Sequence, residues 1–443
     1  MFQLKDVFID RSFAGVQAEN PDEPLRKESD LCTLPRAQER SDRKRETESK
    51  ATALTDFEKK HGVTVEQKDD KYIITLKANG VDEEIARTEA SAKGLEQAEK
   101  ELGRRIAEKK KHLETTFKVS FSTDGEDVLN QWIEKQDCSW ERGAMIKARG
   151  PNLNELAGIE AALYRAQPSH LTRDGQQGVK FYFLTDNYYR KDPALAYFIS
   201  GDKNGRQAVY FEPGANEGKP ATEADADRMG KHHLYSIEAV AHHELMHNAQ
   251  HNMGWSTPKT KEGWARAVGW MPFEDPKTHE TKWIFRGKEE DLYRRDKDHC
   301  KDEAKWCSCT KAGGLLNAGA QEVASVKQAK HFTGDEIRDR ALVKPCTYYF
   351  VNPLEMFAEG GMKYRVNERR REELLTESPT LYEAVKKHDQ YEINRTYGVD
   401  ASQQPKYIRK PDGYLAHNTA ESRKAIEDFE ERVKNKAKDK SKR

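Results

Sequence analysis

The feature that most constrains this chain is the pentapeptide His243-Glu244-Leu245-Met246-His247, which lies in a segment with helical apolar spacing. On a helix, residues four positions apart share a face, so His243 and His247 can offer imidazole nitrogens to one metal ion. Glu244 is then placed to act on a metal-bound water. Two neutral imidazoles suit zinc, and a catalytic zinc keeps one position open for water. The alternative is a pair of surface histidines beside a solvated glutamate.

The neighbouring residues predict both the helix and its orientation. Ser236 is a good N-cap residue. An apolar stripe with a spacing of four residues follows it, formed by Ile237, Ala241, Leu245 and Ala249. This stripe lies roughly opposite His243 and His247 on the helix. We therefore expect one face to pack inward and the other to present the histidines to a cleft.

A catalytic zinc usually takes three protein ligands, so a third must come from elsewhere. His251 lies about 12 Å along the helix axis from His243, which is too far for one zinc ion to bind both. We expect His251 to be a core or cleft-rim residue. The extended metzincin pattern needs Gly and His where this chain has Gln250 and Met253, so that class is excluded.

A distant carboxylate is the remaining source of the third ligand. Asn352 as N-cap and Pro353 as first helical residue predict a second helix. Glu355 and Glu359 lie four residues apart and therefore share a face of that helix. The alternative for Glu355 is a capping-box contact with Asn352, in which it only satisfies a backbone amide.

The two motifs together resemble the gluzincin metallopeptidases, specifically the branch typified by the catalytic domain of anthrax toxin lethal factor. In that branch a Glu-Phe-Phe-Ala-Glu helix follows the His-Glu-x-x-His helix. The matching segment here is Glu355-Met356-Phe357-Ala358-Glu359. The resemblance implies one catalytic Zn²⁺ ion, bound by His243, His247 and Glu355. It also implies Glu244 as general base, and Glu359 as the residue that orients a ligand.

The resemblance also implies a tyrosine that donates to the oxyanion, and the matching residue is Tyr348, seven residues before Glu355. The adjacent Tyr349 leaves this assignment open by one position. The chain departs from the family at Gly360-Gly361, where we expect the second helix to end or kink early. Roughly a hundred residues separate the two motifs, which predicts an insertion at about 256–345.

The pattern before the motif predicts an α+β fold of the zincin type: a mixed sheet with an edge strand, an active-site helix and a second ligand-bearing helix. The predicted elements are a strand at 117–121, a helix at 154–166 and strands at 179–184, 194–199 and 207–211. Their order is similar to that of zincin peptidases. Strand 207–211 is the candidate sheet edge on which a peptide could dock, with plain core packing as the alternative.

Composition predicts the domain organisation, because charged residues make up 34% of the 443 residues and apolar ones only 36%. Within the small segment that precedes the catalytic region, strands near 63–65 and 72–76 form a hairpin, followed by a charged helix at about 82–114. The predicted parts are a largely disordered charged segment (1–55), a small α+β segment (56–116), the zincin-like catalytic domain (117–400) and a charged C-terminal tail (401–443).

Charge, hydropathy and cysteine content exclude several classes. A formal net charge of zero argues against a nucleic-acid binder. The sequence has neither an apolar run of membrane-spanning length nor a signal-peptide core, so we expect synthesis in a cytoplasm and any export or injection by a non-classical route. Six cysteines do not indicate a disulfide scaffold. His299, Cys300, Cys307 and Cys309 are candidates for a second, structural zinc site, with ordinary thiols as the alternative.

The sequence thus predicts a zinc-dependent endopeptidase that acts on a protein or peptide substrate. The resembled branch contains toxin-like members, so an effector that cleaves its own chain or one host protein is one form of this prediction. The rival is a non-catalytic zincin-fold protein, such as a structural or cargo component of a secretion or phage-like particle. The presence of Glu244 favours the endopeptidase over the non-catalytic protein, since a scaffold has no need of a general base.

Overall fold

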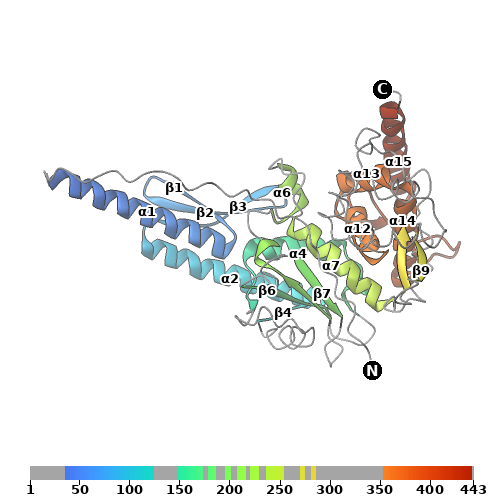
Figure 1. Cartoon of the computed structure of the whole chain (residues 1–443), viewed down its shortest axis with the longest axis horizontal. Helices are drawn as coiled ribbons and strands as arrows, with labels where there is room; N and C mark the ends of the chain where they lie inside the picture. Colours follow the sequence, from blue (N-terminus) through green and yellow to red (C-terminus); the bar gives the residue numbers. More distant parts are fainter. Residues whose placement is uncertain are drawn as a thin grey trace.

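The computed structural model is an α+β structure in which three groups of elements follow one another along the chain (Figure 1). An N-terminal unit of helices and a small sheet extends to one side. A mixed sheet covered by helices forms the centre, and the C-terminal helices lie on the other side of the helix that carries both motif histidines. The structure describes residues 35–123, 148–172, 178–185, 195–200, 207–215, 220–228, 236–253, 270–274, 281–285 and 353–441.

The central sheet has five strands in the order β4-β6-β8-β7, with β5 paired to β6 outside this order. Strand β6 pairs in parallel with β4 and β8, whereas β7 is antiparallel to β8 and β5 is antiparallel to β6. The strands are β4 (Ser120–Phe121), β5 (Ala148–Arg149), β6 (Lys180–Leu184), β7 (Ala196–Ser200) and β8 (Gln207–Phe211). The predicted mixed sheet is therefore present, although β4 is shorter than predicted because the preceding helix continues to Phe117.

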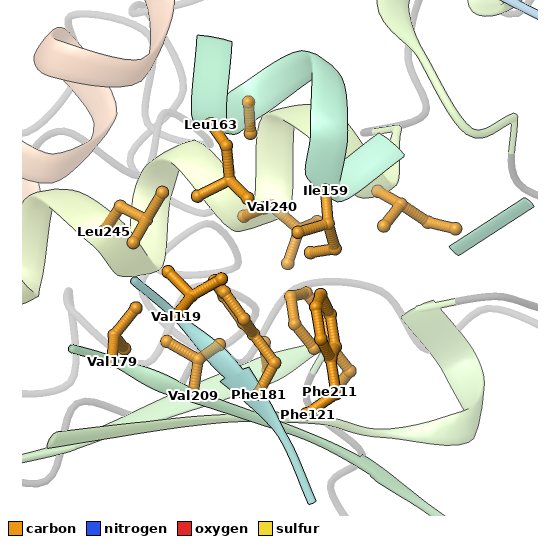
Figure 2. Packing of buried hydrophobic residues seen from close by; sticks show 14 of the residues in the cluster. Val119, Phe121, Ile159, Leu163, Val179, Phe181, Val209, Phe211, Val240 and Leu245 are labelled. Carbon is orange, nitrogen blue, oxygen red and sulfur yellow. The ribbon is translucent and has the colours of Figure 1, made fainter. Parts of the chain in front are cut away.

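The main core lies between this sheet and two helices, α4 (Leu153–Arg165) and α7 (Ile237–Asn252) (Figure 2). Asn152 and Glu155 start α4 with a reciprocal capping box, which satisfies two backbone N–H groups at the buried helix end. Rings from neighbouring strands stack in the core, with the Phe183 and Phe211 centroids 5.0 Å apart. This core fixes the position of α7 over the sheet.

The prediction that strand 207–211 forms the sheet edge is wrong. That strand is β8, which pairs with β6 on one side and with β7 on the other. All five of its side chains are buried, as expected for a central strand covered on both faces. Among the described strands, β7 is the one at this edge, since it pairs with β8 alone.

The N-terminal unit packs two helices on a three-stranded antiparallel sheet of order β1-β2-β3. The predicted hairpin is present as β1 and β2, but the prediction of a helix from residue 82 is wrong, because residues 81–89 form strand β3. The reason is the turn at Asn79 and Gly80, whose φ angles of 57° and 74° are those of a tight hairpin turn. The elements are α1 (Pro35–His61), β1 (Thr64–Lys68), β2 (Lys71–Ala78), β3 (Val81–Glu89) and α2 (Ala92–Phe117).

Helix α1 begins at Pro35, inside the segment 1–55 that composition indicates as largely disordered. The described side chains from 48 to 53 are all exposed, and the partly buried Leu54 and Phe57 pack against the small sheet. An exposed helix of this kind needs no apolar stripe, because charged residues with good helix propensity are enough. The absence of apolar periodicity therefore did not reveal it.

The hairpin turn of the N-terminal unit is bound by a carboxylate of the central part. Asp225 lies on the short helix α6 (Glu223–Arg228), and its two oxygens accept hydrogen bonds from the backbone N–H groups of Asn79 (3.1 Å) and Gly80 (3.0 Å). Arg228 adds an ion pair to Asp82 at 2.7 Å. These contacts fasten the small sheet to the segment that leads into α7.

The C-terminal part is mainly helical. Its second core includes Phe429 and Val433, so the region predicted as a charged tail contains a packed helix. Every helix among the described residues is too short or too polar to cross a bilayer. The elements of this part are α12 (Pro353–Val366), α13 (Glu368–Glu377), α14 (Pro379–Tyr397), β11 (Tyr407–Arg409), β12 (Leu415–His417) and α15 (Ala420–Ser441), and the described ranges before it include the hairpin of β9 (Trp270–Glu274) and β10 (Thr281–Phe285).

The prediction that the second motif helix ends at Gly360-Gly361 is wrong, because α12 continues to Val366. Both glycines lie where the helix is crowded by neighbours. A Cβ atom on Gly361 would lie 2.8 Å from Met246 Cγ of α7, and one on Gly360 would lie 3.1 Å from the side chain of Leu381 of α14. The two glycines therefore allow close helix packing instead of breaking the helix.

Candidate metal centre

Helix α7 begins at the predicted N-cap, since the Ser236 hydroxyl accepts a hydrogen bond from Ala239 N at 3.0 Å. The same hydroxyl donates to the buried Glu223 carboxylate at 3.2 Å. Arg370 of α13 also donates to Glu223, at 2.9 Å. The start of α7 is thereby tied to α13, the helix that follows the second motif helix α12 in the chain.

The two motif histidines are buried in the structure, and the expected cleft stays a prediction. Every side chain of α7 from Ile237 to Gln250 is buried. The apolar stripe packs against the sheet and α4, as predicted. The opposite face, which carries His243 and His247, is covered by α12. The reason is that the second motif supplies another helix, whose packing against α7 brings Glu355 to the histidines.

The structure brings His243, His247 and Glu355 together into one buried group that could hold a metal ion. The Nε2 atoms of the two histidines are 3.1 Å apart, and they lie 3.0 Å and 3.2 Å from Glu355 Oε2. The three residues are 6%, 2% and 1% exposed. A tetrahedral zinc ion with ligands at about 2.0–2.1 Å places those ligands about 3.3 Å from one another. The observed triangle fits that size.

The charges of the group favour a bound cation. Burial alone would raise the pKa of Glu355, but His247 and His243 outweigh burial and lower it to about 2. Burial lowers the pKa of His243, but hydrogen bonds to Glu355 and Glu359 raise it well above its ordinary value. Glu355 is therefore ionised at neutral pH in a buried site, where a carboxylate needs a cation beside it. A proton on His243 or a metal ion satisfies that need.

Each imidazole also meets a polar side chain at its other nitrogen. Glu359 Oε2 lies 3.4 Å from His243 Nδ1. Gln250 Oε1 lies 3.2 Å from His247 Nδ1, and Gln250 Nε2 donates to Leu354 O at 2.7 Å. Such contacts fix which ring nitrogen faces a metal. Sequence reasoning named Glu359 for this role and missed Gln250, although its position three residues after His247 places it on the same helix face.

Two other predicted residues of α7, Glu244 and His251, lie among the described residues. Glu244 is buried beside the group, and its charge contributes to the raised pKa of His243. His251 is partly buried near the end of α7, with its ring 6.4 Å from that of Phe198, and it is not a member of the group. The tyrosines 348 and 349, together with the candidate second zinc site at residues 299–309, lie outside the described residues.

Close packing of α12 on α7 predicts that Gly361→Ala will weaken metal binding. The new Cβ would be 2.8 Å from Met246 Cγ, so α12 or the buried Met246 has to move. Such overpacking costs about 1–3 kcal/mol, and the movement separates Glu355 from the histidines. Gly360→Ala is the matched control, because its Cβ meets Leu381 of α14 and leaves the α7 side unchanged. Zinc titration and thermal unfolding of both variants check the prediction, and equal zinc affinities would contradict it.

In comparisons with known proteins, no family model, curated protein or solved structure matches the chain. The class of this protein therefore has to be inferred from its fold and its candidate metal site. It is an α+β protein with a buried His-His-Glu group on two helices, compatible with a zincin site built from His-Glu-x-x-His and a distant glutamate. A group of this composition indicates a metal-dependent hydrolase.

Proposed function

We propose that the protein is a zinc-dependent endopeptidase of the gluzincin type, with zinc held by His243, His247 and Glu355. The observation that carries this proposal is the triangle of two Nε2 atoms and one carboxylate oxygen with edges of 3.0–3.2 Å. Two imidazoles and one carboxylate are the ligand set of catalytic zinc in several peptidases, and they leave one position open. The general-base position of the motif is filled by Glu244, which favours an enzyme over a scaffold.

In the proposed hydrolysis of a peptide bond, the zinc ion and the side chains of this chain have different roles. When bound, zinc supplies a Lewis acid that polarises a peptide carbonyl and lowers the pKa of water towards 7. Glu244 takes the proton of the attacking water and passes it to the leaving amine. A tyrosine donates a hydrogen bond to the developing oxyanion, where charge builds up in the transition state. Glu359 orients the His243 ring through its Nδ1 atom.

The sheet edge offers a place for an extended substrate. Strand β7 contacts α7, and among the described strands it pairs with β8 alone. A peptide that adds to β7 by main-chain hydrogen bonds would run beside the helix that carries the two histidines. Main-chain recognition of this kind is compatible with many peptide sequences, which agrees with an endopeptidase.

Metal analysis and a cleavage assay test the proposal together. We expect one zinc per purified chain and cleavage of a peptide library that stops on chelation and resumes when zinc is restored. A chain that binds zinc but cleaves nothing in the library or in denatured proteins would favour the non-catalytic scaffold. A chain without bound zinc, even after dialysis against the ion, would refute the metal site itself.

The tyrosine assignment can be settled by comparing two variants on one substrate. Tyr348→Phe is expected to keep zinc and reduce the rate of the chemical step by roughly 10²–10³, as removal of one oxyanion donor does. Tyr349→Phe is the matched neighbour, and side chains one residue apart point in different directions. A loss confined to Tyr349→Phe would move the role by one position. Normal rates in both variants would remove tyrosine from the mechanism.

A further inference from the structure

The amide of Gln250 joins the two helices of the candidate metal centre. Its Oε1 atom lies 3.2 Å from His247 Nδ1, and its Nε2 atom donates to the backbone carbonyl of Leu354 at 2.7 Å. Leu354 immediately precedes Glu355 on α12. One buried side chain of α7 therefore contacts one histidine of the group directly and the residue next to its glutamate.

These contacts determine the hydrogen positions on His247. A backbone carbonyl can only accept, so the Gln250 NH₂ group must face Leu354 and the Gln250 oxygen must face His247. That oxygen can only accept as well, so His247 Nδ1 must carry a hydrogen. The neutral ring then has its lone pair on Nε2, which is the atom that lies beside His243 Nε2 and Glu355 Oε2.

We propose that Gln250 is a positioning residue of the metal centre, which holds His247 in its Nδ1–H form and fixes α12 at the distance that brings Glu355 to the ion. This inference rests on the proposed zinc site but not on peptidase activity. Residues that orient a metal-bound histidine contribute 10–100-fold to metal affinity. Gln250 contacts both a histidine and the helix of another ligand with a single amide.

Zinc affinity, measured by competition with a chromophoric chelator, tests the proposal in three variants. Gln250→Met keeps the length of the side chain and removes both contacts, so its affinity should fall about 10–100-fold. Gln250→Glu still accepts from His247 but cannot donate to Leu354, so it should recover part of that loss. Asn248→Ala is the control, because this buried amide of the same helix donates to His170 O at 2.6 Å and lies outside the group of His243, His247 and Glu355.

We expect Asn248→Ala to change zinc affinity less than threefold. Equal affinities for Gln250→Met and Asn248→Ala would overturn the proposal. The histidine ¹⁵N spectrum of the metal-free wild-type chain gives an independent answer if a variant fails to fold. His247 should show the Nδ1–H form, and a neutral Nε2–H form would overturn the proposal. Failure of the wild-type chain to bind zinc would refute the proposed function instead, and the spectrum would still report the tautomer.

Discussion

Replacing Glu244 by glutamine is expected to lower peptide hydrolysis by about 10²–10⁴-fold, the usual contribution of a general base. The amide has nearly the same shape as the carboxylate but cannot accept the proton of the attacking water. Zinc content should remain at the wild-type level, since Glu244 is not a member of the ligand group. Single-turnover cleavage and metal analysis of the same preparation measure both quantities.

Glu238→Gln is the control for this variant, because Glu238 is another buried glutamate of α7. Burial raises the pKa of Glu238 to about 7, so glutamine resembles its protonated form. Glu238 accepts from Glu223 N at 3.1 Å and pairs with Arg165, and it takes no part in the metal group. Its replacement should alter stability more than turnover. Near-normal hydrolysis by Glu244→Gln would exclude the peptidase mechanism.

Replacing His243 by alanine is expected to remove zinc from the purified protein. A residue that only orients a ligand contributes 10–100-fold to affinity, so loss of a direct ligand should cost more than about 100-fold. Glu355 would then keep its buried charge with one partner fewer, so the variant should also unfold at a lower temperature. Metal analysis and thermal unfolding with and without added zinc give the two readouts.

His251→Ala is the matched control on the same helix. His251 lies eight residues after His243 and outside the ligand group, so this variant should keep its zinc. Equal zinc content in wild type, His243→Ala and His251→Ala would show that the metal, if any, binds elsewhere in the chain.

The parts of the fold that depend on residues close together in the sequence could be predicted. The Ser236 cap, helix α7 and a helix from Pro353 follow from short-range rules, and these helices carry the three residues that meet. The opposition of the apolar stripe and the histidines also follows from helix geometry. Short-range rules could not show that α12 covers the histidine face, because that helix is more than a hundred residues away, and only the family resemblance placed Glu355 beside the histidines.

The errors have local and long-range origins. Residues 81–89 are charged enough to be taken for a helix, but the turn at Asn79 and Gly80 makes them an edge strand, where charged side chains are common. The apolar composition of β8 does not distinguish a central strand from an edge strand. Gly360 and Gly361 lower helix propensity locally, yet the neighbours at Leu381 and Met246 decide their role. The contact of Gln250 with His247 follows from helix spacing, but its contact with Leu354, 104 residues away, could not be predicted.

The separation of the ligands along the chain has a consequence for folding. His247 and Glu355 are 108 residues apart, and a cation held between them closes that length of chain into a loop. A cross-link over a loop of about 100 residues lowers the conformational entropy of the unfolded chain, which stabilises the folded state by roughly 4–5 kcal/mol. A bound ion would act like such a cross-link, but a reversible one whose effect grows with the free metal concentration. The concentration of available metal would then set how stable the folded protein is, apart from any catalysis.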